Sequence, residues 1–296
     1  MRFNSRENWN SGNKFNENIP SNFGKIDSAK GLVRYLDDFS ARTKNYKYIY
    51  HYTSLRNLIK ILSGGFWHLA NAKDMNDQLE YQLGDSSKWK RIYFASFMMD
   101  SKESIGMWSM YAQPWETGVK ITLPISAVRK WIKEKPHLYA LKKDTTGNFN
   151  FAAPLEPISD AKVDLKLSAV VYSNADSLET PDQGEYLSWS HSTNTIIKHV
   201  HKFPELTGYI KDKAWDYEKE IRLKAVMSSE CDFDRIAIKI SQDLIDSMII
   251  TASPLFEGDL QSKIEDEIKL QIKTDRSIFS DRLHIKTICS SCDLRQ

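Results

Sequence analysis

Residues 48–70 read YIYHYTSLRNLIKILSGGFWHLA, and this stretch decides the fold. An aromatic and β-branched run, typical of a strand, ends at His51, and Ser54 follows as a helix N-cap. Apolar residues then recur at helical spacing until Gly64 and Gly65, which supply a left-handed helix stop. A second aromatic run follows. The stretch therefore predicts strand, helix and strand, with a histidine at a strand end where it can hold a polar ligand.

The composition is that of an ordinary globular protein. The chain has 296 residues, of which 41% are hydrophobic and 27% charged, and its formal net charge is +2. That charge does not require a nucleic-acid partner, nor does it exclude one, because aromatic side chains and a few cations can hold a single strand. Residues 1–27 are rich in Asn, Ser and Gly. We expect a flexible N-terminal arm there, followed by a single domain over residues 28–296.

The cysteine count and the apolar segments indicate the cellular compartment of the protein. Cys289 and Cys292 form one CxxC pair, but a second pair is missing, so the pattern does not predict a zinc site or any other metal. The odd count of three cysteines and the lack of a secretory signal favour a reducing, cytoplasmic location. No stretch approaches the roughly 20 apolar residues of a transmembrane helix, so we expect no membrane partner.

The remaining segments mix strands and helices. We expect strands at residues 91–98, 118–123, 167–172, 220–226, 235–240, 246–251 and 284–289. We expect helices at residues 104–112, 125–133, 181–204 and 260–272, and a long loop at 140–160. Because the order shows no regular βαβ alternation, it favours an α+β fold. The sequence has neither GxGxxG nor a P-loop, so it supports neither a Rossmann site nor an NTPase site.

Two polar clusters at the amino-terminal end could bind a ligand. His51, Tyr52 and Thr53 end the first strand, although a lone histidine is more often a packed structural residue. Asn76 and Asp77 follow the second aromatic run, where a turn with local side-chain hydrogen bonds is the simpler interpretation.

An aromatic cluster follows in the expected helix at 104–112. Trp108 and Tyr111 are three residues apart, so they lie near one face of that helix. Core packing is the default interpretation of such a pair. The functional alternative is an aromatic face on which a flat ring can stack.

An acidic and basic cluster stands at the start of the expected strand EIRLKAV. Glu218, Glu220 and Arg222 share one face if the strand extends through them. They can form a solvated edge. They can also form a catalytic row, in which the arginine orients a carboxylate and keeps it ionised.

These clusters together resemble the DUF2971 family of uncharacterised bacterial proteins, from about residue 48 to about residue 253. The family has a tyrosine-rich strand before a short helix, an Asn-Asp turn, a Met-Trp-x-x-Tyr helix and a Trp-x-x-Glu-x-Glu-x-Arg strand. The matching segments here are Tyr48 to Thr53, Asn76-Asp77, Met107 to Tyr111 and Trp215 to Arg222. The Asn-Asp-Pro often seen in such proteins is Asn-Asp-Gln in this chain.

The same segments resemble the His-Tyr-Glu type of ADP-ribosyltransferase, which includes poly-ADP-ribose polymerases and DNA-modifying toxins. HYTSLRNLIKILSGGF is similar to their His-Gly-Thr/Ser segment with its helix, and IYFASF is similar to an Ile-Tyr-Phe-Ala strand. Tyr52 stands where the family usually has glycine. The resemblance implies two packed, mostly antiparallel sheets that form an NAD cleft, with peripheral helices.

The resemblance also implies roles for individual residues. His51 would bind the adenosine ribose, backbone groups of Tyr52 or Thr53 would hold the nicotinamide amide, and Asn76 and Asp77 would contribute to NAD binding. Tyr111 or Trp108 would stack on the nicotinamide, while Tyr93 competes for the tyrosine position. Glu220 would stabilise the cationic sugar, with Glu218 as the second candidate and Arg222 beside them. No metal would be needed.

The implied activity is NAD-dependent ADP-ribosyl transfer by a bacterial toxin or anti-phage effector. The expected partners are NAD as co-substrate, an RNA, DNA or protein acceptor, and an antitoxin. Two alternatives stay open: an NAD glycohydrolase on the same fold, and a non-catalytic ligand-binding or interaction module.

Overall fold

The computed structural model describes residues 46–74, 89–141, 156–159, 163–173, 186–190, 195–199, 210–231, 233–280 and 282. The predicted arm at residues 1–27, the Asn76-Asp77 turn, the CxxC pair and the strand expected at 284–289 lie outside these ranges. The predicted boundary of a single domain at residue 28 lies outside them as well and stays a prediction.

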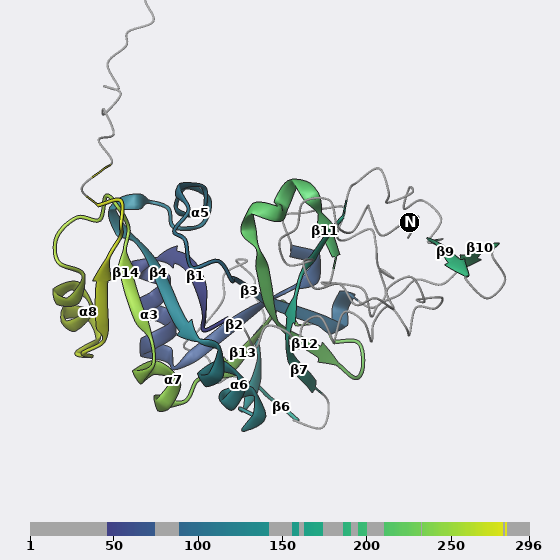
Figure 1. The fold of residues 1–296 in the computed structure, drawn as a ribbon. Coiled ribbons are helices and arrows are strands. Elements are labelled where there is room, and N and C mark those ends of the chain that lie inside the picture. The colour runs from purple at the N-terminus through teal and green to yellow at the C-terminus, as the bar shows by residue number, and fades with distance from the viewer. Residues whose placement is uncertain are drawn as a thin grey trace, which may run out of the picture.

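One connected sheet of eleven strands forms the body of the described structure (Figure 1). Its strands are β1 (Tyr48–Ser54), β2 (Phe66–Asn71), β3 (Ile92–Met98), β4 (Gly118–Pro124), β5 (Leu138–Leu141), β6 (Glu156–Ile158), β7 (Val163–Ala169), β12 (Glu220–Met227), β13 (Arg235–Lys239), β14 (Ile249–Ala252) and β15 (Lys273–Arg276). Their order is β15-β14-β4-β1-β3-β2-β13-β5-β6, and β12 pairs with β3 and β7. All pairs in this sheet are antiparallel except β14 with β15. The predicted α+β fold class is confirmed.

The sheet consists of two parts that meet at β3. Strand β12 pairs with β3 along its length, from Glu220 opposite Met98 to Val226 opposite Ile92. Strand β1 joins β3 through one Cα pair, Tyr50 with Met98. The two sheets expected from the sequence are therefore joined into one, and their junction is narrow.

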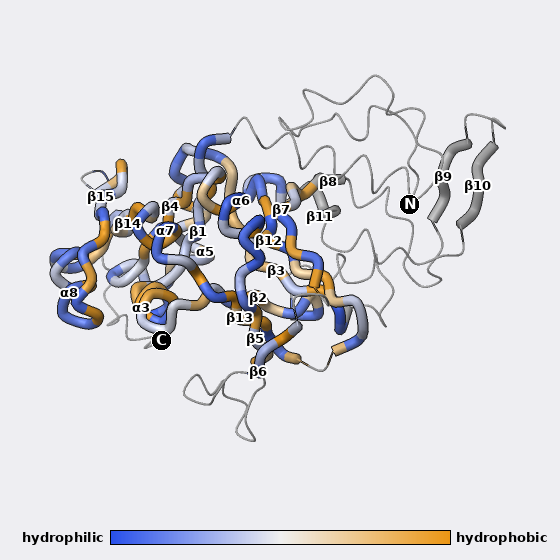
Figure 2. Tube along the Cα trace, turned by 90° about the horizontal axis from the view of Figure 1, so that it is seen from below, coloured by the Kyte–Doolittle hydropathy of each residue, from blue (hydrophilic) through white to orange (hydrophobic). Residues whose placement is uncertain are grey.

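Within the described ranges, five helices lie beside the sheet: α3 (Leu55–Gly64), α5 (Ile105–Tyr111), α6 (Ile125–Lys133), α7 (Gln242–Asp246) and α8 (Leu260–Ile268). Helix α3 begins and ends as the sequence predicts, because the Ser54 hydroxyl accepts from Asn57 N and Gly65 adopts φ 68°. Its apolar residues pack into the main core with those of β1, β4 and β12. In Figure 2, α3 and α8 each carry hydrophobic and hydrophilic positions, as amphipathic surface helices do.

Short elements complete the description. Single 3-10 turns are η4 (Ala72–Asp74), η5 (Trp89–Arg91) and η6 (Trp115–Thr117), and the longer η11 covers Lys213–Glu218. Strand β8 (Val171–Ser173) pairs in parallel with β11 (Ile210–Asp212). Strand β9 (Tyr186–Ser190) pairs antiparallel with β10 (Thr195–His199).

Three sequence expectations were wrong in this part of the chain. The helix expected at 181–204 contains the strands β9 and β10, whose Tyr, Trp, Thr and Ile residues favour extended backbone. The loop expected at 140–160 contains β6, which pairs with β5. Glu218 does not belong to the strand of Glu220, because it ends η11 and Lys219 between them adopts φ 43°.

Candidate active site

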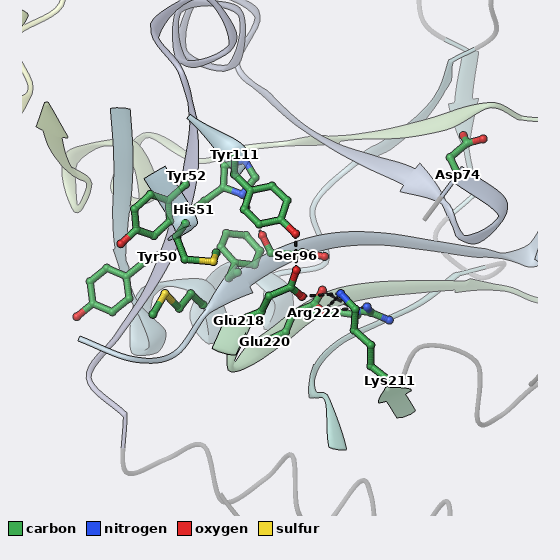
Figure 3. Close-up of a pocket in the computed structure, with 13 residues that line it drawn as sticks. Tyr50, His51, Tyr52, Asp74, Ser96, Tyr111, Lys211, Glu218, Glu220 and Arg222 are labelled. Atoms are coloured by element: carbon green, nitrogen blue, oxygen red, sulfur yellow. Dashed lines mark hydrogen bonds and ion pairs between the residues drawn. The ribbon is translucent and has the colours of Figure 1, made fainter. Parts of the chain in front are cut away.

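A pocket lies at the junction of the two parts of the sheet. Tyr50 and Met98, the pair that joins β1 to β3, both line it. Its volume is about 190 Å³, against the roughly 10–15 Å³ that one water molecule needs. The pocket can therefore admit part of an organic ligand. Figure 3 shows Ser96, Tyr111, Lys211, Glu218, Glu220 and Arg222 close together, with Asp74 apart from them.

His51 enters the pocket with its tautomer fixed. Its Nδ1 lies 2.9 Å from the carbonyl oxygen of Ser96 on β3. A carbonyl only accepts, so Nδ1 carries the proton and Nε2 keeps the lone pair. Burial lowers the pKa of His51, although the Ser96 contact opposes that shift. The ring also packs edge-on against Trp67, with centroids 5.3 Å apart. His51 thus presents a neutral acceptor atom.

Tyr111 reaches the pocket from the last turn of α5. The Ser104 hydroxyl caps this helix by accepting from Met107 N at 3.4 Å. Gly118 on β4 lets the end of α5 come close, because a Cβ at that position would lie 2.4 Å from the carbonyl oxygen of Ala112. The Tyr111 hydroxyl donates to Glu218. Burial, and next the hydrogen bond to Glu218, raise the pKa of Tyr111, so its hydroxyl stays protonated.

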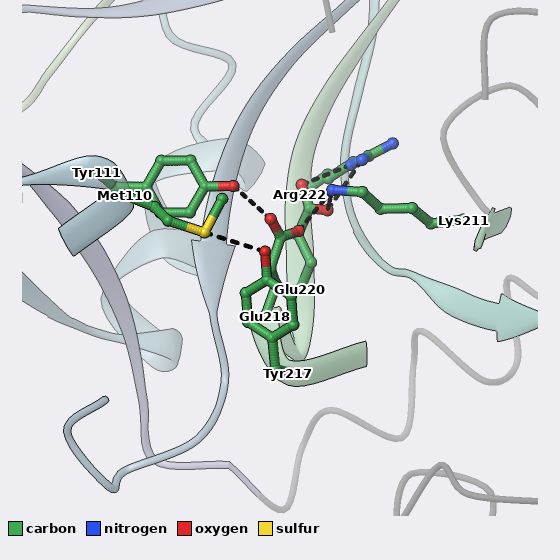
Figure 4. A network of polar contacts seen from close by, with 7 residues as sticks. All are labelled: Met110, Tyr111, Lys211, Tyr217, Glu218, Glu220 and Arg222. Atoms are coloured by element: carbon green, nitrogen blue, oxygen red, sulfur yellow. Dashed lines mark hydrogen bonds and ion pairs between the residues drawn. The ribbon is translucent and has the colours of Figure 1, made fainter. Parts of the chain in front are cut away.

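Four charged side chains, here called the pocket cluster, lie together on the β11–η11–β12 segment: Lys211, Glu218, Glu220 and Arg222 (Figure 4). Arg222 grips Glu220 with two hydrogen bonds, Nε to Oε1 at 2.7 Å and Nη2 to Oε2 at 2.9 Å. Lys211 Nζ lies 2.5 Å from Glu218 Oε2 and 3.4 Å from Glu220 Oε2. Each of the four side chains is at most 7% exposed. When both glutamates are ionised, two positive and two negative charges balance inside the protein.

The charges of the pocket cluster depend on one another. Burial raises the pKa of Glu220 to about 7, while Lys211 opposes the rise, Glu218 adds to it, and the Ser96 side chain opposes it by hydrogen bonding. Burial disfavours the charge of Lys211, but Glu220 and Glu218 outweigh it and raise the pKa of the ammonium group. The pKa of Glu220 therefore lies close to neutral pH, where this carboxyl group changes its protonation state.

The left-handed residue Lys219 shapes the cluster. A non-glycine residue with positive φ costs about 1–3 kcal/mol, so the surrounding contacts must hold it. Here the Lys219 carbonyl accepts from Met99 N at 2.9 Å, and its side chain pairs with Asp100. This turn ends η11 and starts β12, and it brings both glutamates to the same pocket.

The structure brings together some of the predicted site residues and separates others. His51, Tyr52, Tyr111, Glu218, Glu220 and Arg222 all line the pocket. Thr53 and Trp108 do not, and the Thr53 hydroxyl instead accepts from Asn57 Nδ2 at 3.2 Å. Tyr93 is fully buried and its hydroxyl donates to the carbonyl oxygen of Phe233. Asn76 and Asp77 lie outside the described residues, although nearby Asp74 lines the pocket.

Trp108 belongs to a second buried ionic group, here called the Glu103 cluster: Glu103, Lys120, Trp108 and Ser277. Lys120 Nζ lies 2.8 Å from Glu103 Oε1, and these side chains are 8% and 6% exposed. Trp108 Nε1 donates to Glu103 Oε2 at 3.3 Å, and the Ser277 hydroxyl donates to the same oxygen at 2.5 Å. The Trp108 ring packs edge-on against Tyr52. Trp108 therefore supports the wall behind the pocket.

Sequence reasoning missed Lys211 and Ser96. Ser96 lies in a mostly apolar strand, and it contacts His51 through its backbone carbonyl, which no sequence pattern reveals. Lys211 stands in a segment without a clear periodicity. Its proximity to the Glu-x-Glu motif was the available signal, but a lysine so placed is usually solvated.

Two negative findings concern the described part of the chain. It holds no group of three or more His, Cys, Asp or Glu residues arranged to bind a metal ion. Within the same ranges, none of the helices has the length and apolar character needed to cross a membrane.

Comparison with solved structures finds DarT from Thermus sp. 2.9. Its complex with NAD+ is 12% identical, with 79% of this chain and 96% of that chain covered and a TM-score of 0.32. The complex with carba-NAD+ is 14% identical over 80% and 97% of the two chains, with the same TM-score. The complex with ADP-ribosylated ssDNA is 12% identical over 78% and 94%, also at 0.32. These values describe a distant likeness. No curated protein sequence matches the chain.

Comparison with protein families finds one model. It is described as a protein of unknown function, DUF2971, and it matches residues 107–223. That range begins on α5 and ends on β12, so it contains Tyr111 and the whole pocket cluster. Over these residues, the predicted resemblance to the DUF2971 family is confirmed.

Proposed function

We propose that this protein is an NAD-dependent ADP-ribosyltransferase. The observation that carries the proposal is that His51, Tyr111 and Glu220, which come from three separate elements, line one pocket. This is the set that the resemblance to His-Tyr-Glu transferases implies for NAD. The wider role, also proposed, is that of a cytoplasmic bacterial toxin or anti-phage effector whose acceptor is a nucleic acid or a protein.

Each of the three residues has a physical role in binding NAD. His51 is neutral, with its lone pair on Nε2, so it can accept a hydrogen bond from a hydroxyl of the adenosine ribose. The ring of Tyr111 lines the pocket and offers a flat surface to the nicotinamide, and Trp108 is too deeply packed for that role. Glu220 supplies the carboxylate beside the nicotinamide ribose.

The proposed chemistry needs only charge placement. The bond between C1′ of the ribose and the nicotinamide nitrogen breaks, and its electron pair leaves with nicotinamide, which becomes neutral. Positive charge then develops on the sugar, where an ionised carboxylate in a buried site stabilises it strongly. A lone pair of the acceptor forms the new bond to C1′, and the acceptor loses a proton. The products are the ADP-ribosylated acceptor, nicotinamide and a proton.

An NAD turnover assay tests the proposal. The purified protein is incubated with NAD labelled in the adenosine moiety, together with RNA, single-stranded DNA or protein extract, while nicotinamide release and label transfer are measured. We expect transfer by the wild type and a loss of about 10²–10³-fold in Glu220→Gln, which keeps the shape of the side chain but not its charge. Glu257→Gln is the matched control, because Glu257 is exposed and does not line the pocket.

Each outcome of this assay decides between the candidate functions. Nicotinamide release without label transfer would favour an NAD glycohydrolase. No release with any acceptor would favour a non-catalytic module. Unchanged turnover in Glu220→Gln would sink the assignment of Glu220 while leaving the activity itself in place.

A further inference from the structure

Lys211 stands out because the sequence resemblance assigns it no role and the structure places it at the centre of the site. Strand β11 lies beside β8, with Lys211 opposite Tyr172. From there the side chain reaches over the start of β12 and contacts both glutamates. Its ammonium group also lies 4.5 Å from the centre of the Trp215 ring. A lysine with only 7% of its side chain exposed needs such partners.

We propose that Lys211 is a positioning residue of this pocket, whose ammonium group holds the carboxylates of Glu218 and Glu220 side by side and both ionised. The proposal rests on the proposed function, since it explains how Glu220 is ready to face a cationic sugar at neutral pH. Arg222 orients Glu220 through two hydrogen bonds. Lys211 contacts both carboxylates through its ammonium group.

The physical argument is the repulsion between buried like charges. Without the ammonium group, the two carboxylates would face each other in a low-dielectric site with one fewer positive charge, and one of them would take up a proton. Glu220 is the carboxylate closest to that change, since burial already raises its pKa to about 7. The titratable and charged side chains that line the pocket are Tyr50, His51 and Tyr52 from β1, Asp74 from η4, Tyr111 from α5, Lys211 from β11, Glu218 from η11, and Glu220 and Arg222 from β12. The charges of Glu218 and Lys211 also act on Tyr217 of η11.

The pH dependence of nicotinamide release tests this role. In Lys211→Met, the pH at which activity is half lost on the acid side should rise by about 1–2 units. Lys211→Arg keeps the cation, so its midpoint should stay near that of the wild type. The double variant Lys211→Met/Glu218→Gln removes one charge of each sign, so it should restore the midpoint. A merely structural role for Lys211 would change the amount of active protein without moving the midpoint.

Lys120→Met is the matched control. Lys120 is as deeply buried as Lys211 and is also paired with a glutamate, but it does not line the pocket. Its loss should lower stability and leave the midpoint in place. An unmoved midpoint in Lys211→Met would overturn the proposal.

A second measurement separates this proposal from the proposed function. In protein labelled with ¹³C at the glutamate carboxyl carbons, NMR titration follows Glu220 directly, with Glu220→Gln identifying its signal. A raised titration midpoint in Lys211→Met, together with no nicotinamide release by the wild type, would support the ion pairing and overturn the proposed function. An unchanged midpoint in this titration would overturn the ion pairing, whatever the activity. If Lys211→Met does not fold, the titration midpoint of Glu220 is compared between the charge-balanced double variant and Glu218→Gln. These two proteins differ only at Lys211.

Discussion

Helix α5 donates a hydrogen bond to each of two buried ionic clusters, and the two differ in what surrounds them. Tyr111 donates to Glu218 of the pocket cluster, and Trp108 donates to Glu103 of the Glu103 cluster. The lysine–glutamate pairs are buried to the same extent, with side chains at most 8% exposed in both. The pocket cluster lines a cavity, whereas the residues of the Glu103 cluster do not line it. The two clusters therefore share their burial of charge, and the position beside a cavity is what makes the pocket cluster the candidate site.

The largest expected effect comes from a substitution that breaks the Glu103 cluster. Lys120→Met leaves the Glu103 carboxylate buried without its cation, and breaking such a pair costs about 3–5 kcal/mol. Urea denaturation should show this loss in the free energy of unfolding. Nicotinamide release per folded molecule should remain close to that of the wild type. A large loss of turnover per folded molecule would mean that the two clusters are not functionally separate.

A smaller effect distinguishes the pocket cluster by its pH dependence. The pKa of Glu220 is raised from 4.5 to about 7 in the folded protein, so the folded state binds more protons than the unfolded state between these values. Burial of protonated Glu220 therefore causes no loss of stability at low pH. The free energy of unfolding falls as the pH rises from about 4.5 to 7.

Comparison of Glu220→Gln with the wild type isolates this contribution. His51 acts in the opposite sense, because its lowered pKa makes stability fall as the pH drops below 6.5, but that effect is common to both proteins. Between pH 5 and pH 8, the wild type should lose more unfolding free energy than the variant, by on the order of 1–3 kcal/mol. A parallel pH profile in the two proteins would show that Glu220 is ionised throughout, as an ordinary paired carboxylate.

The smallest expected effect comes from the contact between α5 and the pocket cluster. Tyr111→Phe keeps the ring and removes the hydroxyl that donates to Glu218. A hydrogen bond to a charged group contributes about 1.5–3 kcal/mol at most, and Lys211 still holds Glu218, so we expect a loss of about tenfold in nicotinamide release. NAD affinity, measured by calorimetry, should change little because the ring remains. A strong loss of affinity would mean that the hydroxyl itself contacts the substrate.

The sequence predicts local structure well where a single segment contains the whole signal. Ser54 and Gly65 bound α3 as expected, because caps and left-handed stops depend on the residues next to them. The helix predicted at 181–204 was wrong because short β-branched and aromatic runs have the same apolar content as a helix. The split of the sheet at β3 could not be predicted, since it depends on which edges of that strand β1, β2 and β12 occupy.

The candidate site was predicted in part for the same reason. Glu218, Glu220 and Arg222 are close in sequence, so their grouping was predicted, but the left-handed turn at Lys219, which takes Glu218 out of the strand, was not. Trp108 and Tyr111 lie three residues apart on one helix, and their separation into two clusters depends on what packs around α5. Lys211 stands on β11, and no local sequence pattern predicts the pairing of β11 with β8.

The spacing of residues along the chain also bears on how the molecule folds. The ion pairs of the pocket cluster join residues two, seven and nine positions apart, whereas the contact of Ser277 with Glu103 joins residues 174 positions apart. Closing a short loop costs less chain entropy than closing a long one, so local contacts form readily in a partly folded chain. The contact of Ser277 with Glu103 requires the segment after β15 to have docked. Its formation would therefore report a completed fold, while the charges of the pocket can pair before that point.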